Sequence, residues 1–151
     1  MIQELTRVAE VIVAYRPKFK ASERPKVTSA NDAYQIFINQ WEKDTIELLE
    51  EFKIMLLDRS KRVLGIARIS VGGVEQTVVD PKIIFAIALK AKASSIILAH
   101  NHPSGNVQAS LTDNKVTEKL RDGGKLLEIE VCDHLIITND GYYSYEEEGL
   151  M

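Results

Sequence analysis

Short apolar segments alternate with segments of helical periodicity along most of this chain, and this alternation limits the folds open to it. Apolar or alternating runs predict strands over residues 51–58, 63–70, 74–79, 95–99, 129–138 and 141–145, and an earlier one over 6–15. Apolar residues at helical spacing predict helices over residues 29–41, 80–89 and 110–121. Strands and helices mixed in this order favour an α/β sandwich over a helical bundle or a barrel.

Residues with special backbone preferences mark two of the predicted helix ends. Asp80 followed by Pro81 is typical of a helix start, with the aspartate as N-cap and the proline in the first turn. Gly123 and Gly124 follow the third predicted helix, and glycine is the residue most often found just past a helix end. We therefore expect that helix to end at this glycine pair.

The composition indicates one globular domain. The chain has 151 residues, of which 45% are hydrophobic and 27% charged, with a net charge of -3. This balance excludes a surface that attracts nucleic acid as a whole, although not a local basic patch. No run of 18 apolar residues is present, so we expect no transmembrane helix. Cys132 stands alone, which excludes an internal disulfide and a cysteine-based zinc finger and suggests a cytoplasmic protein.

The N-terminal part differs in character from the rest. Residues 16–26 hold two prolines among five basic side chains, which predicts an exposed, irregular arm. We therefore divide the chain into an N-terminal strand and basic arm, residues 1–29, and a domain, residues 30–151. The arm is either simply solvated or able to contact nucleic-acid phosphates, and the sequence leaves the oligomeric state open.

The residue types that carry chemistry are concentrated between positions 100 and 113. His100 and His102 lie on the same side of an extended chain, and Asp113 follows in the first turn of the next predicted helix. Two imidazoles and a carboxylate can hold zinc and leave a fourth position for water. The pattern has a second interpretation, because Ser110 and Asp113 resemble a helix capping box. The two interpretations are compatible.

The complete string points to a family. A His-x-His pair, seven residues, a serine, two residues and an aspartate resemble the JAMM metalloprotease signature of JAB/MPN domains. The longer text around it resembles the bacterial RadC family in particular; it consists of residues 79–82, 100–105, 110, 113, 133–137 and 141–144. The resemblance implies an α/β fold of the JAB/MPN type, with a mixed sheet flanked by helices in a single domain.

The resemblance also implies roles for individual residues. His100, His102 and Asp113 would bind Zn²⁺, and Ser110 would help to hold the oxyanion of a tetrahedral intermediate. A glutamate on an upstream strand would act as general base in the hydrolysis of a peptide or isopeptide bond. The family carries a DNA-repair label, which makes nucleic acid a candidate partner; no membrane partner is implied.

One part of the family pattern is not matched where we expect it. The family glutamate is expected on the strand before the glycine-rich turn, where this chain has Ala67 and Arg68. Neither side chain can act as a base at neutral pH, and Glu75 is the nearest carboxylate. The sequence thus supports either a zinc-dependent hydrolase with Glu75 as its base or a non-catalytic zinc-binding JAB domain that acts as a protein or DNA-repair interaction module. His134 is a second open case, since it would either face the metal cleft or lie in the core.

Overall fold

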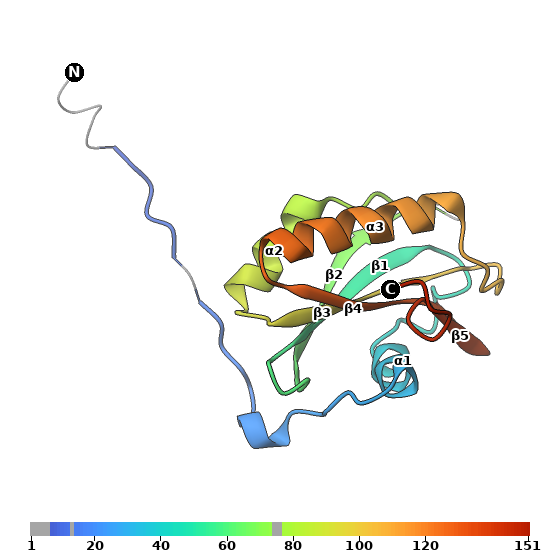
Figure 1. Cartoon of the computed structure of the whole chain (residues 1–151), viewed down its shortest axis with the longest axis horizontal. Helices are drawn as coiled ribbons and strands as arrows, with labels where there is room; N and C mark the ends of the chain where they lie inside the picture. Colours follow the sequence, from blue (N-terminus) through green and yellow to red (C-terminus); the bar gives the residue numbers. More distant parts are fainter. Residues whose placement is uncertain (1–6, 13, 74–76) are drawn as a thin grey trace.

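The computed structural model describes residues 7–12, 14–73 and 77–151, and its centre is one mixed five-stranded sheet (Figure 1). The strand order is β2-β1-β3-β4-β5. Only β3 and β4 run parallel; the other neighbours are antiparallel. The elements are η1 Ala21–Glu23, α1 Ala30–Asn39, β1 Glu51–Leu57, β2 Val63–Val71, α2 Pro81–Lys90, β3 Ser95–Asn101, α3 Leu111–Leu126, β4 Glu130–Thr138 and β5 Gly141–Ser144. The predicted α/β class with a mixed sheet and flanking helices is confirmed.

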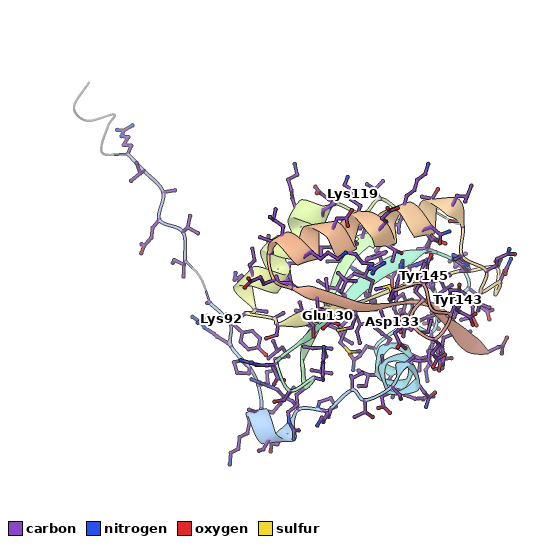
Figure 2. All side chains as sticks on the ribbon, in the orientation of Figure 1. Lys92, Lys119, Glu130, Asp133, Tyr143 and Tyr145 are labelled. Carbon is purple, nitrogen blue, oxygen red and sulfur yellow. The ribbon has the colours of Figure 1, made fainter. Side chains whose placement is uncertain are left out.

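Helices cover both faces of the sheet. Helix α1 lies against one face, whereas α2 and α3 lie together against the other (Figure 1). Strands β1 and β3 occupy the middle of the sheet, and every residue of both is buried. Their largely apolar sequences therefore reflect burial on two faces rather than one. Figure 2 shows Lys119 on the side of α3 that points away from the sheet, as expected for a helix with one apolar face.

Helix α3 extends beyond its predicted end. It runs to Leu126, so Gly123 and Gly124 lie inside the helix and do not terminate it. A Cβ atom on Gly124 would lie 2.3 Å from the backbone oxygen of Ile129. This glycine is therefore required for close packing between the helix and the chain entering β4, which the capping preference did not anticipate.

Two predicted strands are not present as expected. Among the described residues of the 6–15 segment, none is in a strand; this part extends away from the sheet (Figure 1). Of the predicted strand 74–79, residues 74–76 lie outside the described residues and 77–79 have no regular structure. The arm rejoins the domain at an isolated bridge between Lys26 and Arg62. Within the described part of the chain, no helix has the length and apolar character needed to cross a membrane.

Candidate metal centre

The candidate site lies where β1 begins, β3 ends and α3 begins, on the face of the sheet that α2 and α3 cover. Strand β1 runs antiparallel to β3, with Phe52 opposite His100, so the beginning of β1 adjoins the end of β3. Helix α3 starts a few residues later, with Ser110 as its N-cap. Because side chains alternate between faces, Glu50, Phe52 and His100 share the face covered by α2 and α3. The topology thus brings residues from three separate segments to one place.

His100, His102 and Asp113 come together as the sequence pattern predicted. The Nε2 atoms of the two histidines are 2.9 Å apart. The Asp113 carboxylate has one oxygen 3.3 Å from Nε2 of His100 and the other 3.4 Å from Nε2 of His102. Ligand atoms around a four-coordinate zinc, at bond lengths of about 2.0–2.1 Å, are themselves about 3.3 Å apart. The spacing therefore fits a zinc-sized cation.

The loop after β3 determines which nitrogen of His102 faces the site. The Nδ1 atom of His102 lies 2.6 Å from the backbone oxygen of Asn106, and a carbonyl can only accept a hydrogen bond. Nδ1 must therefore carry the proton, which leaves the Nε2 lone pair free to bind a cation. The turn closes through Gly105, whose amide donates to the oxygen of His102 and whose φ of 81° favours glycine.

Asp113 has two functions in this arrangement. Its carboxylate accepts from the Ser110 amide at 2.9 Å, while its own amide donates to the Ser110 hydroxyl oxygen at 3.0 Å. This is the capping box suggested by the sequence, and it aims the carboxylate at the histidines. The Ser110 hydroxyl hydrogen remains available, because the oxygen only accepts in the capping bond. The capping box is thus observed, and it places the Asp113 carboxylate beside both histidines.

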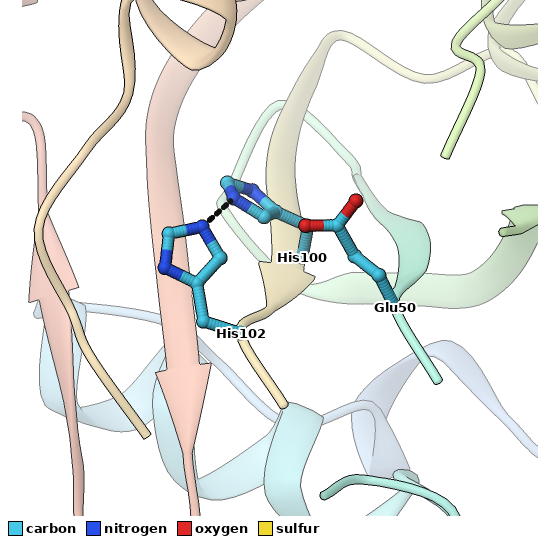
Figure 3. Close-up of side chains that lie close together, drawn as sticks. All are labelled: Glu50, His100 and His102. Atoms are coloured by element: carbon cyan, nitrogen blue, oxygen red, sulfur yellow. Dashed lines mark hydrogen bonds between the residues drawn. The ribbon is translucent and has the colours of Figure 1, made fainter. Parts of the chain in front are cut away.

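Glu50 supplies a carboxylate that the sequence analysis did not assign to the site. It precedes β1 and offers an oxygen that lies, with one nitrogen of each histidine, in a group whose atoms are all within 4.8 Å of one another (Figure 3). The residue is only 7% exposed. Its backbone bonds to both Gly72 and Gly73, which fixes its position against the turn that follows β2.

The strand on which we expect the family glutamate does not supply the carboxylate that lies beside the histidines. Ala67 and Arg68 lie on β2, two strands away from β3, and Arg68 Nη1 lies 3.6 Å from a Glu51 carboxylate oxygen. Glu75, the base suggested from the sequence, lies outside the described residues. Strand β1, rather than β2, is the neighbour of β3, and this is why the carboxylate beside the histidines comes from position 50.

Asn101, between the two histidines, faces the opposite side of the sheet and holds the segment that carries Glu50. Its side-chain amide donates to the backbone oxygens of Ile46 at 2.7 Å and Leu49 at 2.8 Å. Its oxygen accepts from the Glu51 amide at 2.7 Å. One fully buried side chain thus connects the end of β3 to the backbone on both sides of Glu50.

The electrostatics of the site favour positive charge at the Nε2 atoms. Burial alone would raise the pKa of Asp113, but hydrogen bonds with His100 and His102 hold that pKa well below its usual range. Burial would lower the pKa of His102, yet the contact with Asp113 raises it above the ordinary value. The ionised carboxylate therefore stabilises either a proton on His102 or a cation that replaces it.

The pKa of Glu50 is shifted in the opposite direction from that of Asp113. Burial raises the pKa of Glu50, and the nearby Asp113 carboxylate acts in the same direction, while His100 and His102 act against them. Two carboxylates with opposite shifts thus face the same pair of imidazoles. One stays ionised and suits cation binding, and the other is shifted towards the range useful for proton transfer.

His134 is a buried histidine that also contacts the site. It has no exposed surface, and its Nε2 atom lies 2.8 Å from Nδ1 of His100. Burial lowers its pKa well below the ordinary value, which keeps the ring neutral. Both sequence-based alternatives therefore apply in part, since His134 is a core residue and also touches a predicted ligand.

The fold and the site together define a class: a mixed α/β sheet whose central strand ends in two imidazoles that meet a carboxylate in the first turn of a helix. The chain belongs to the RadC-like JAB domain family, whose profile matches residues 27–150. The resemblance inferred from the sequence is thereby confirmed.

Curated relatives in several organisms are similar to most of this chain. The UPF0758 protein of Flavobacterium johnsoniae is 39% identical over 127 residues, which are 83% of this chain and 53% of that protein. The UPF0758 protein of Alkaliphilus metalliredigens is 36% identical over 163 residues, which are 99% of this chain and 69% of that protein. The UPF0758 protein of Methanococcoides burtonii is 38% identical, covering 97% of this chain and 59% of that protein. The chain thus spans little more than half the length of two of these three relatives.

Proposed function

We propose that this chain is a zinc-dependent hydrolase of the JAMM type that cleaves a peptide or isopeptide bond. The observation that carries the proposal is the convergence of the buried Glu50 carboxylate with His100 and His102. Asp113 lies within 3.4 Å of both histidines and completes the set. His100, His102 and Asp113 have the residue types and spacing of a three-ligand zinc site.

Each of the remaining steps is assigned to a residue of this chain. Zinc bound there would supply a Lewis acid that polarises an amide carbonyl and makes water acidic. Glu50 takes the proton from the attacking water and returns it to the leaving amine, a role that suits a buried carboxyl with a raised pKa. Ser110 donates its free hydroxyl hydrogen to the oxygen that becomes negative as the carbonyl is attacked.

The alternative function, a non-catalytic zinc-binding domain that acts as an interaction module, depended on the absence of a general base from the expected strand. Ala67 and Arg68 cannot take protons at neutral pH, and a domain that relied on that strand would bind zinc without turnover. Glu50 supplies a carboxylate from the residue just before β1, so the reason for preferring an interaction module no longer applies. Peptide and isopeptide bonds remain the proposed substrate class.

The test compares Glu50→Gln with Glu51→Gln. Both remove one buried carboxylate, but position 50 faces the histidines, whereas Glu51 contacts Lys53 and Arg68. Zinc content is measured by elemental mass spectrometry, and turnover is measured on a library of fluorogenic peptides and ε-lysyl isopeptides. We expect Glu50→Gln to keep about one zinc per chain and lose about 10²–10⁴ in rate, as is typical for removal of a general base.

The Glu51→Gln variant is expected to keep both zinc and turnover. Full activity in Glu50→Gln would contradict the assignment of the base. A wild-type chain that takes up no zinc under metal-replete conditions, or that cleaves nothing in the library, would contradict the proposed hydrolase.

A further inference from the structure

A buried hydrogen-bond chain extends from His100 into the protein, away from the candidate metal position. His100 Nδ1 lies 2.8 Å from His134 Nε2, and His134 Nδ1 lies 2.6 Å from the Thr117 hydroxyl oxygen. That hydroxyl also lies 2.7 Å from the backbone oxygen of Asp113, one turn earlier in α3. His134 has no exposed surface, and Thr117 is 2% exposed.

The chemistry of these groups allows one arrangement that leaves His100 ready to bind a cation. The Asp113 carbonyl can only accept, so the Thr117 hydroxyl donates to it and its oxygen accepts from Nδ1–H of His134. Nε2 of the neutral His134 is then an acceptor and receives Nδ1–H of His100. His100 therefore presents an unprotonated Nε2 to His102 and Asp113. The opposite arrangement, with the Thr117 hydroxyl donating to His134, would place a proton on Nε2 of His100 and block that ligand position.

The fold holds the His134 ring in place for this contact. The β3–β4 register shifts between Val131 and Asp133, so a bulge at Cys132 changes which face the following residues occupy. Val131 and His134 consequently share the face covered by α3, although their spacing would separate them in a regular strand. Tyr145 stacks on the His134 ring at 5.0 Å with planes 12° apart. This arrangement restricts rotation of the ring.

We propose that Thr117 and His134 are positioning residues that fix the Nδ1–H form of His100 and so prepare its Nε2 atom to bind the metal. The inference rests on the zinc site of the proposed function. It extends that site by a pair of residues that touch neither metal nor substrate. Residues that hydrogen-bond to the far nitrogen of a metal-binding histidine typically change metal affinity 10–100-fold when they are removed.

The test uses a matched pair of variants at position 117. Thr117→Val keeps the shape of the side chain and removes the hydroxyl, whereas Thr117→Ser keeps the hydroxyl and removes a methyl group. Zinc dissociation constants are measured by competition with a chromophoric chelator, using Zn²⁺ alone as the ligand. We expect zinc binding to weaken about 10–100-fold in Thr117→Val and to stay within about 3-fold of wild type in Thr117→Ser.

A spectroscopic measurement separates positioning from general loss of structure. The nitrogen chemical shifts of His100 report which ring nitrogen carries the proton. In the zinc-bound wild type we expect a proton on Nδ1 of both His100 and His134. His134→Phe, which keeps a ring but removes the acceptor, is expected to weaken zinc binding as Thr117→Val does.

The outcomes distinguish failure of the inference from failure of the proposed function. Tight zinc binding by wild type with unchanged affinity in Thr117→Val would overturn the inference and leave the zinc site standing. Equal losses in Thr117→Val and Thr117→Ser would also overturn it, because they would reflect packing rather than the hydroxyl. A wild type that binds no zinc would overturn both.

Discussion

At the scale of single residues, the position of Glu50 depends on an amide side chain on the other face of the sheet. Asn101 makes three hydrogen bonds to the backbone around Glu50, and every atom of the residue is buried. Nothing in the local sequence indicates this role, because Asn101 lies between two histidines and the His-x-His pattern predicts a function only for the histidines. The contacts join positions about 50 residues apart, and such pairings are determined by tertiary structure rather than by local preference.

Replacing Asn101 by alanine tests this role. The change leaves the Glu51 amide and the carbonyls of Ile46 and Leu49 without their buried partner, and each such group costs about 1–3 kcal/mol. We expect the free energy of unfolding to fall by about 2–4 kcal/mol in urea titrations. Asn139→Ala is the matched control: its side chain bonds to Glu47 in an exposed position, and we expect a change within about 0.5 kcal/mol. Equal effects of the two variants would contradict the role of Asn101.

At the scale of elements, the sequence predicts where strands and helices lie better than it predicts which strands are adjacent in the sheet. The buried run 51–58 and the capped start at Asp80 locate β1 and α2 to within a residue, because both signals are local. The order of the strands is not local, and it decides which segment lies beside His100 and offers it a carboxylate. From the sequence, that carboxylate is expected on the 63–70 strand, which is β2. The antiparallel neighbour of β3 is instead β1. The grouping of His100, His102 and Asp113 could be predicted from the sequence because all three lie within 14 residues of one strand–loop–helix segment.

The packing of α3 against the start of β4 gives a prediction at this scale. In Gly124→Ala the new methyl group would meet the Ile129 backbone oxygen, and a backbone atom cannot move aside as a side chain can. Overpacking of this kind costs about 1–3 kcal/mol, and the intrinsic helix preference of alanine returns at most about 1 kcal/mol. We expect a melting temperature lower by several degrees, measured by circular dichroism. Gly65→Ala, whose Cβ would meet no atom within 4 Å, is the control and should change the melting temperature little.

At the scale of the whole molecule, one tyrosine joins the last segment of the chain to the sheet and to α3. Tyr145 donates its hydroxyl to Asn114 at 2.6 Å, stacks on His134, and has its amide bonded to the His134 carbonyl. Next to it, Asp133 accepts from the Ser144 hydroxyl and from the Glu146 amide. The C-terminal residues thus contribute to the same core that supports the candidate metal centre.

Titration of Tyr145 makes the stability of the whole domain sensitive to alkaline pH. Burial raises the pKa of Tyr145 from 10.0 to about 12, so the folded state keeps a proton that the unfolded state releases. Since the folded state binds more protons between these values, the free energy of unfolding falls as pH rises through this window. We expect Tyr145→Phe, which keeps the stacked ring, to show a smaller fall between pH 9 and pH 12 in urea titrations with zinc chelated. The free energy of unfolding of each protein is compared with that of the same protein at pH 9. The hydrogen bond to Asn114 that Tyr145→Phe lacks therefore does not affect the comparison. An equally steep fall in the variant would mean that other groups, such as Tyr34, Tyr142 and Tyr143, whose pKa values burial also raises, carry the alkaline dependence.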